Sequence, residues 1–275
     1  MLKKGIILIA TGHAGYGKLA YNLAMTIKSI ESTPIAVIYE EVALSHLSDK
    51  QKEVFDFTIE LPSDYKTGFG TKLHLDQLTP FEQTLFLDAD MLWLGKKPSQ
   101  IFEELQGNDF MIIHEGNSDA FNAKYYFWAD SKDIQTAYNV EKVYQTRSEV
   151  IYFEKGTKVF KKARELKPEK KLKSIRMFGA HIPDELYFNI ALAILKVELK
   201  PFNPAYWARL NREVMPKLST LHNDYYLLSF GSNTASPAMK KIYDNVMLVA
   251  ANKLRLPYLF KLQSKKEWAP GRLKI

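Results

Sequence analysis

The 275-residue sequence contains no cysteine, which excludes disulfides, thiolate metal sites and a cysteine nucleophile. Any metal site must therefore use oxygen or imidazole ligands. Long hydrophobic runs are also missing, because no segment reaches the roughly 18 to 20 apolar residues of a transmembrane helix. The first apolar run, from Ile6 to Ala10, breaks at Thr11-Gly12 and is too short for a signal peptide. We therefore expect a soluble, cytoplasmic protein.

Positive charge, by contrast, is abundant and unevenly placed. The net charge is +7, and residues 158–176 contain nine basic side chains against two acidic ones. Residues 253–275 contain seven basic side chains against one acidic one, which leaves a mildly acidic remainder. Two such patches suit a polyanionic acceptor, nucleic acid or an anionic membrane surface. Alternatively, the lysines form a solvated helix face that binds no partner. Peripheral attachment to a membrane surface stays open.

Apolar runs alternate with helical spacing along the first half of the chain, which predicts an α/β fold. The predicted strands here are 5–10, 34–39, 55–61 and 84–87, and the predicted helices are 17–30 and 72–78. In the second half the predicted strands are 150–153 and 225–230, and the predicted helices are 159–166, 184–195 and 239–254. We expect a mainly parallel central sheet flanked by helices, with ligands at the carboxyl ends of its strands.

A single domain accounts for this pattern. We expect a catalytic domain over residues 1–250, with a nucleotide-sugar-binding half at 1–95 and an acceptor and catalytic half at 96–250. Residues 251–275 form a basic C-terminal tail in this scheme.

Two aspartates follow the predicted strand 84–87. Asp88 and Asp90 are separated by the small residue Ala89, and apolar residues resume at once. Side chains at i and i+2 of a strand share a face, so both carboxylates can reach one hard divalent cation. Two carboxylates that close repel each other, and a bound cation reverses this cost. The motif therefore predicts a site for a metal and a diphosphate.

The segment 71–94, TKLHLDQLTPFEQTLFLDADMLWL, resembles the diagnostic region of the GT-A glycosyltransferases. It is most similar to family 8, the group of glycogenin and the lipopolysaccharide galactosyltransferases. The resemblance implies the GT-A fold, a Rossmann-like fold of nucleotide-diphospho-sugar transferases. It also implies that Lys72 contacts the sugar nucleotide, and that the motif Asp88-Ala89-Asp90 holds Mn²⁺ or Mg²⁺ and the diphosphate of a UDP-sugar.

The same resemblance extends to other segments. In this group the loop after the first strand surrounds the nucleobase and ribose, which assigns donor binding to Ala10, Thr11, Gly12 and Tyr16. The segment 184–189 looks like the start of the family's catalytic helix. This implies catalytic roles for Asp184 and Glu185 and donor binding for Asn189, whereas an acidic helix N-terminus after Pro183 is the structural alternative.

Two positions depart from the family pattern. The Asn-Ser-Gly strand of the family becomes Arg147-Ser148-Glu149 here, so the roles of its asparagine and glycine do not transfer. The family's third metal ligand is a histidine, but Ser229 stands at that position. His222 is our candidate for the third ligand, with Ser229 and His181 as alternatives.

The resemblance implies a metal-dependent glycosyltransferase that moves a hexose from a UDP-sugar to an acceptor hydroxyl with retention of configuration. An inverting enzyme, which would need Asp184 or Glu185 to deprotonate the acceptor, is the alternative. For the acceptor, we rank a glycan or lipid-linked glycan first and modified bases of DNA second. A P-loop NTPase competes with this interpretation because Gly12 to Lys18 fits Gly-x-x-x-x-Gly-Lys, although Leu19 offers no hydroxyl to Mg²⁺. A non-catalytic protein that binds sugar nucleotides or nucleic acid is a further alternative.

Overall fold

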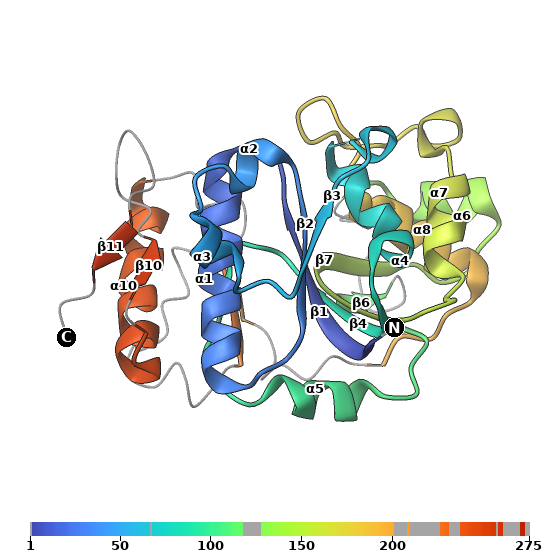
Figure 1. Ribbon diagram of the computed structural model, residues 1–275. Helices are drawn as coiled ribbons and strands as arrows, with labels where there is room; N and C mark the ends of the chain where they lie inside the picture. Colours follow the sequence, from blue (N-terminus) through green and yellow to red (C-terminus); the bar gives the residue numbers. More distant parts are fainter. Residues whose placement is uncertain are drawn as a thin grey trace. The chain divides into compact units, whose positions relative to one another are not determined.

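The computed structural model describes residues 2–66, 68–117, 128–200, 208–209, 226–230, 237–256, 258–260 and 270–272. A six-stranded sheet with the strand order β3-β2-β1-β4-β7-β6 forms its centre (Figure 1). The strands are β1 (Leu2–Ala10), β2 (Ile35–Tyr39), β3 (Phe57–Glu60), β4 (Phe81–Leu87), β6 (Phe110–Asn117) and β7 (Tyr144–Glu154). β1, β2 and β3 pair in parallel, whereas β6 and β7 are antiparallel.

The chain divides into two compact units, one of residues 1–60, 85–106 and 203–275 and the other of residues 61–84 and 107–202. We call them unit 1 and unit 2. The division falls inside β4, so that its last residues, Leu85 to Leu87, belong to unit 1.

Unit 1 is built around a long helix, α1 (Ala14–Ile30), which packs on β1, β2 and β5 (Met91–Trp93). α2 (Glu41–Leu44), β10 (Tyr258–Phe260) and α10 (Pro237–Leu254) also contact α1. β5, β9 (Leu227–Ser229) and β8 (Ala208–Arg209) form a three-stranded sheet, and β10 pairs with β11 (Pro270–Arg272). α3 (Asp49–Lys52) and α5 (Pro98–Leu105) complete the described elements of this unit.

Unit 2 packs its helices on β7. α8 (Asp184–Leu195) contacts β7, α7 (Val159–Glu165) and α6 (Ser131–Tyr138). The helical turn η2 (Gly68–His74) contacts α7, α8 and the short helix α4 (Leu75–Leu78). Two further turns, η1 (Ser63–Tyr65) and η3 (Pro168–Lys170), lie nearer the surface.

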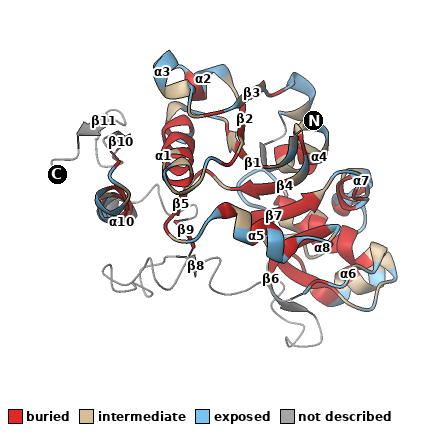
Figure 2. Cartoon of the chain, turned by 60° about the horizontal axis from the view of Figure 1, so that its bottom comes forward, coloured by how far each residue is buried: buried red, intermediate tan, exposed pale blue. Residues whose placement is uncertain are grey.

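The core follows the apolar runs of the sequence. β2 is buried at four of its five positions, and residues 150–153 of β7 are all buried. Figure 2 shows these buried residues along the strands and on α1 and α8. Strands covered on both faces have continuous apolar sequences rather than alternating ones, as the sequence predicted for this sheet. Within the described ranges, no helix is both long and apolar enough to cross a membrane.

Most predicted elements are confirmed, with shifted boundaries. α1 begins at Ala14, three residues before the predicted start, because His13 caps it by accepting a hydrogen bond from Gly15 N at 2.9 Å. The predicted helix 72–78 is a 3₁₀ turn followed by the short helix α4. β5, α5, β6 and α6 are additional elements that the sequence does not predict.

Candidate functional site

The Asp88-Ala89-Asp90 motif lies at the carboxyl end of β4. β4 ends at Leu87, and Ala89 and Asp90 form the turn into β5. Ala89 is buried and both aspartates are partly exposed. This end of a strand is where ligands bind in α/β sheets, and carboxylates in such a position are suitable ligands for Mg²⁺ or Mn²⁺. The donor set therefore fits a hard divalent cation.

Within unit 1, backbone hydrogen bonds next to β9 hold this turn in place. The peptide N–H of Phe230 donates to the carbonyl of Asp90 at 3.1 Å, and that of Leu94 donates to the carbonyl of Tyr226 at 2.8 Å. The Phe230 ring packs edge-on against Tyr243 of α10. Burial raises the pKa of Tyr243, and the negative charge of Asp90 contributes to the same direction. Backbone bonds and packing thus fix the position of Asp90.

The third metal ligand is not settled by the geometry. His222 lies outside the described residues. Ser229 pairs with Met91, is fully buried, and its hydroxyl has no hydrogen-bond partner in the described part of the chain. His181, in unit 2, is exposed. No group of three or more histidine and acidic side chains that could hold a metal exists among the described residues.

The loop after β1 is tied to the end of β2. Gly12 adopts a φ of +86°, which favours glycine, and its N–H donates to Glu40 Oε2 at 2.7 Å. The N–H of Glu40 donates in turn to the carbonyl of Ala10 at 3.1 Å. Thr11 is partly exposed, and Tyr16 is 42% exposed with its ring 5.0 Å from that of His13. The sequence does not single out Glu40, although it directly follows the predicted strand 34–39.

The geometry contradicts a P-loop at Gly12 to Lys18. A phosphate-binding loop precedes its helix, but Ala14 to Lys18 already belong to α1. A Cβ on Gly17 would collide with the carbonyl group of Ala43, whose carbon would lie only 2.8 Å away. Lys18 is 5% exposed and lies 5.5 Å from the centroid of the Phe260 ring. Glycine and lysine serve packing here, and the NTPase alternative is wrong.

Unit 2 brings together residues from three separate segments. Lys72 Nζ, on η2, donates to both the carbonyl oxygen and the hydroxyl of Ser148 at 3.2 Å each. It also lies 3.8 Å from Asp184 Oδ2, and the two side chains are 15% and 3% exposed. Lys72 and Asp184, both candidates from the sequence, thus form a partly buried ion pair. Ser148 joins them, although the sequence assigns it no role.

A bulge in β7 explains how Ser148 reaches Lys72. Ile112 of β6 pairs with Ile151, but the next residue, Ile113, pairs with Arg147, so residues 148–150 have no partner in β6. Bulges of this kind change the direction of side chains and occur next to functional sites. Arg147 forms an ion pair with Glu115, and Glu149 is buried. Arg147 and Glu149, the two residues that depart from the family pattern, therefore place charges of opposite sign on either side of Ser148.

Asp184 is the first residue of α8, following Pro183. The positive end of the helix dipole stabilises its carboxylate there. Asp184 Oδ2 accepts no hydrogen bond from any described residue, although it is buried. The Lys72 ammonium group lies 3.8 Å away, beyond hydrogen-bond distance, so this oxygen can accept a hydrogen bond from a hydroxyl of a bound ligand. Glu185, next to it, is partly exposed.

Asn189 does not use its carbonyl oxygen for a ligand. Its Oδ1 accepts from the N–H of Thr146 at 3.1 Å and from its hydroxyl at 2.6 Å. These bonds join α8 to β7 near Ser148 and Asp184. Asn189 therefore positions the cluster in the structure, and its Nδ2 is buried without a hydrogen-bond partner among the described residues.

Unit 2 also contains a hollow of about 520 Å³. It is lined by neighbours of Lys72 in sequence, Gly70, Leu73 and His74, and by residues 180–182 just before α8. Arg164 also lines it and binds both carboxylate oxygens of Asp76, at 2.5 and 3.0 Å. The hollow is thus lined by sequence neighbours of Lys72 and Asp184, whereas Lys72, Ser148 and Asp184 themselves do not line it.

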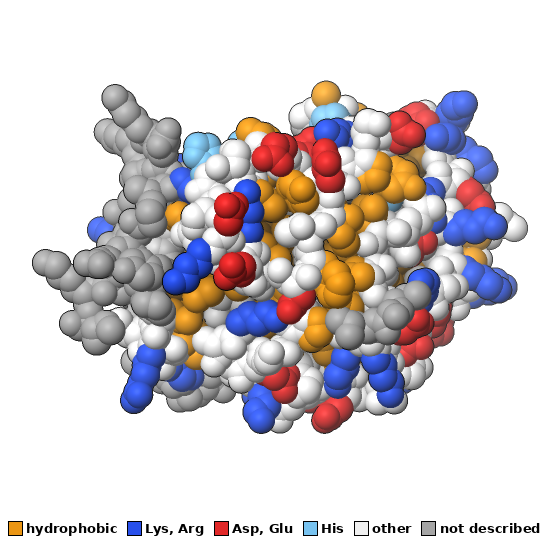
Figure 3. All heavy atoms as spheres, in the orientation of Figure 1, with side chains coloured by type: hydrophobic (Ala, Val, Ile, Leu, Met, Phe, Trp, Pro, Cys, Tyr) orange, Lys and Arg blue, Asp and Glu red, His pale blue; other side chains and the backbone are white. Residues whose placement is uncertain are grey.

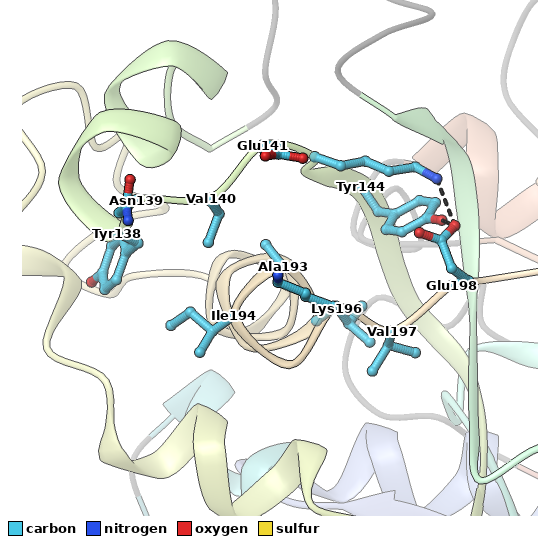
Figure 4. A pocket seen from close by; sticks show the side chains of 12 residues that line it. Tyr138, Asn139, Val140, Glu141, Tyr144, Ala193, Ile194, Lys196, Val197 and Glu198 are labelled. Atoms are coloured by element: carbon cyan, nitrogen blue, oxygen red, sulfur yellow. Dashed lines mark hydrogen bonds and ion pairs between the residues drawn. The ribbon is translucent and has the colours of Figure 1, made fainter.

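A second hollow, of about 460 Å³, lies around the C-terminal end of α8 (Figure 4). Lys142 and Tyr144 both donate hydrogen bonds to Glu198, at 2.6 and 3.0 Å, and the figure shows Tyr144 beside Glu198. The hydrogen bond to Lys142 lowers the pKa of Glu198. Because its lining begins at Leu192 of α8, eight residues after Asp184, this hollow lies about 12 to 15 Å along the helix from Asp184 and is separate from the cluster.

The sheet order and its helices define the GT-A fold, which confirms the fold class predicted from the sequence. The chain aligns with the bifunctional glycosyltransferase WbbM at a TM-score of 0.60 and 11% identity, over 91% of this chain and 50% of that one. The chain thus spans half the length of that protein. No protein-family model and no curated protein matches the sequence.

Two further solved structures resemble this chain over almost the whole of their own length. Mouse xyloside xylosyltransferase 1 aligns at a TM-score of 0.55 and 11% identity, over 86% of this chain and 100% of that one. The galactosyltransferase LgtC, in complex with donor and acceptor sugar analogues, aligns at 0.55 and 12% identity, over 88% of this chain and 95% of that one. Identities this low show a shared fold.

Proposed function

We propose that this protein is a glycosyltransferase that moves a hexose from a UDP-sugar to a hydroxyl of a glycan or lipid-linked glycan. The observation that carries the proposal is the cluster of Lys72, Ser148 and Asp184 in unit 2. The family resemblance assigns Lys72 and Asp184 to the donor, and they come from segments far apart in the sequence. The ion pair between them, at 3.8 Å, supports that assignment.

Lys72 supplies a positive charge whose attraction to a diphosphate is strengthened by partial burial. The ammonium group is mostly shielded from water, so its attraction to a departing diphosphate is much larger than at an exposed site. Ser148 orients it with two hydrogen bonds before the donor arrives. Asp184 Oδ2 accepts a hydroxyl of the donor sugar in this proposal, which would satisfy its unused acceptor.

Asp88 and Asp90 would hold the divalent cation, since both are partly exposed at the end of β4. Bound there, Mn²⁺ or Mg²⁺ supplies Lewis-acid stabilisation of the diphosphate. The loop of Ala10, Thr11 and Gly12, with Tyr16, would bind the nucleobase and ribose. Glu40 keeps this loop in place through its bond to Gly12.

The reaction breaks the bond between the anomeric carbon and the diphosphate oxygen and forms one to the acceptor oxygen. With retention of configuration, as the resemblance implies, no strong general base is required. An inverting enzyme would need Asp184 or Glu185 to take the acceptor proton. The anomeric configuration of the product, read by NMR, decides between the two.

The proposal is tested by incubating the protein with a panel of UDP- and GDP-sugars, with Mn²⁺, Mg²⁺ or EDTA, and measuring release of the nucleoside diphosphate. We expect UDP from at least one UDP-sugar with Mn²⁺ and none with EDTA. ATP serves as the matched control and should remain intact. Binding of a sugar nucleotide without any turnover, with or without acceptor glycans, would favour the non-catalytic alternative.

Replacing Lys72 by methionine should lower donor hydrolysis by roughly 10² to 10³-fold, the usual loss when one transition-state donor is removed. The apolar chain keeps the packing but leaves Asp184 without its cation. Lys28→Met is the matched control, because Lys28 also pairs with an acid, Asp56, at 2.6 Å. Full activity in Lys72→Met with reduced stability would make the pair purely structural.

A further inference from the structure

A short hairpin stands immediately before α8. The N–H of Phe178 donates to the carbonyl of His181 at 2.9 Å, and the N–H of His181 donates back to Phe178 at 3.2 Å. Gly179 takes a φ of +60°, which lets two residues close the turn. The N–H of Arg176 donates to the carbonyl of Trp128 at 2.8 Å and anchors the base of the hairpin. The tip is therefore a defined structure.

This hairpin presents two adjacent apolar side chains to solvent. Met177 is 50% exposed and Phe178 is 48% exposed, and the Phe178 ring meets Trp128 edge-on at 6.2 Å. The gold loop at the top of Figure 1 leads into α8, and hydrophobic side chains stand at the corresponding point of Figure 3. Single exposed apolar residues are ordinary, but a neighbouring pair at the tip of a turn indicates a contact surface.

The segment that leads to the hairpin, residues 158–176, is itself rich in basic side chains. Figure 3 shows Lys and Arg gathered at the edge of the view that carries α6 and α7 in Figure 1. The exposed members of the segment are Lys158, Lys161, Lys167, Lys170, Lys171, Lys173 and Arg176. Of its two acids, Glu165 is already paired with Lys162. The segment therefore carries seven exposed basic side chains against two exposed acids, Glu165 and Glu169, and continues in sequence directly into Met177.

We propose that the hairpin and the basic segment 158–176 form a docking surface for an anionic lipid bilayer. Met177 and Phe178 enter the interface, and the lysines attract the negative headgroups. The Trp128 ring supports Phe178 from behind by edge-on packing. Duplex DNA offers phosphates for the lysines, but its backbone gives no apolar layer for the tip, so the bilayer fits both features.

The surface has a consequence for the acceptor, and this step alone rests on the proposed function. The hairpin continues through Ile182 and Pro183 directly into Asp184 at the start of α8. A chain docked by its tip would hold the cluster of Lys72 and Asp184 close to the headgroups. That location suits an acceptor hydroxyl carried by a lipid.

The test is co-sedimentation of the full chain with vesicles of phosphatidylcholine alone or with about 30 mol% phosphatidylglycerol, at about 0.1 M salt, where surface charges still act over roughly 10 Å. We expect binding only to the anionic vesicles. Met177→Ser with Phe178→Ser should weaken it at least tenfold. Lys170→Gln, Lys171→Gln and Lys173→Gln together should weaken it about 100-fold, since each cation near such a surface contributes about fivefold.

Matched controls carry the same changes elsewhere. Val42 is equally exposed at 50%, so Val42→Ser should bind as the parent does. A triple variant of exposed lysines, Lys3→Gln, Lys50→Gln and Lys241→Gln, should lose far less than the segment variant. Unchanged thermal unfolding of the hairpin variant shows that it folds, and unchanged hydrolysis of soluble donor by the triple variant of Lys170, Lys171 and Lys173 separates docking from catalysis.

Three results would overturn the proposal: no binding to anionic vesicles, binding that ignores the hairpin substitutions, or tighter binding to duplex DNA than to vesicles at the same salt. Donor hydrolysis without vesicle binding would reject the docking surface and leave the proposed function intact. Vesicle binding without hydrolysis of any donor would do the reverse.

Discussion

Replacing Asp88 or Asp90 by asparagine is expected to lower metal-dependent donor hydrolysis by about 10³-fold or more. Asparagine keeps the size and an oxygen of the side chain but removes the charge that a divalent cation needs. The substitution leaves the bond between Phe230 and the carbonyl of Asp90 in place, since that bond uses the backbone. Activity should therefore fall while the unfolding midpoint stays nearly unchanged or rises, because two nearby negative charges are reduced to one.

Two measurements check this expectation. Release of UDP reports the reaction, and titration calorimetry with Mn²⁺ reports the site in the absence of donor. Asp49→Asn, at an exposed position of α3, is the matched control and should retain both. Wild-type hydrolysis in either motif variant would remove the metal assignment from Asp88-Ala89-Asp90, whatever the fold implies.

Gly17→Ala is expected to destabilise the protein by about 2 to 4 kcal/mol, the larger end of what overpacking costs. In an open helix the same change stabilises by about 1 kcal/mol, because alanine has the higher helix propensity. Here the added Cβ would overlap the carbonyl group of Ala43, which is backbone and cannot rotate away. α1 and α2 must separate to admit it, and urea unfolding measures the loss.

Gly156→Ala provides the comparison. Gly156 has a φ of +97°, and nothing lies within 4 Å of the position that an alanine methyl would take, so only backbone strain opposes the substitution. That strain costs about 1 to 2 kcal/mol. A Gly17→Ala variant as stable as the parent protein would show that the close approach of α1 and α2 is not required. It would also reopen the question of what this glycine does beside Lys18.

The sequence predicted the parts of the molecule whose signals are local. Continuous apolar runs indicated β1, β2 and the end of β4, because a strand covered on both faces needs them. Helical spacing and the acids after Pro183 predicted α8 with both of its boundaries, Asp184–Leu195. Lys72 and Asp184 follow from the family resemblance, and the structure brings them together in an ion pair at 3.8 Å, a proximity that the sequence does not predict.

The rest depends on contacts that no local pattern encodes. Ser148 lacks a signal because its neighbours Arg147 and Glu149 depart from the family, and the bulge that presents it depends on strand register. Glu40 belongs to no motif, and only its bond to Gly12 shows its part in the loop. α6 escapes prediction because polar residues dominate its eight positions. The roles of His222 and of the two basic patches stay predictions.

The interleaving of the two units also limits how the chain can be divided. Unit 1 uses three separate stretches of sequence and unit 2 uses two, so every single cut inside the chain removes part of at least one unit. Unit 1 is complete only when residues 1–60 have contacted residues 85–106 and residues 203–275. Contacts between stretches so far apart in the sequence form slowly. During synthesis on the ribosome, unit 2 has all its residues before unit 1 does. A chaperone that protects exposed apolar strands would therefore act first on β1 and β2.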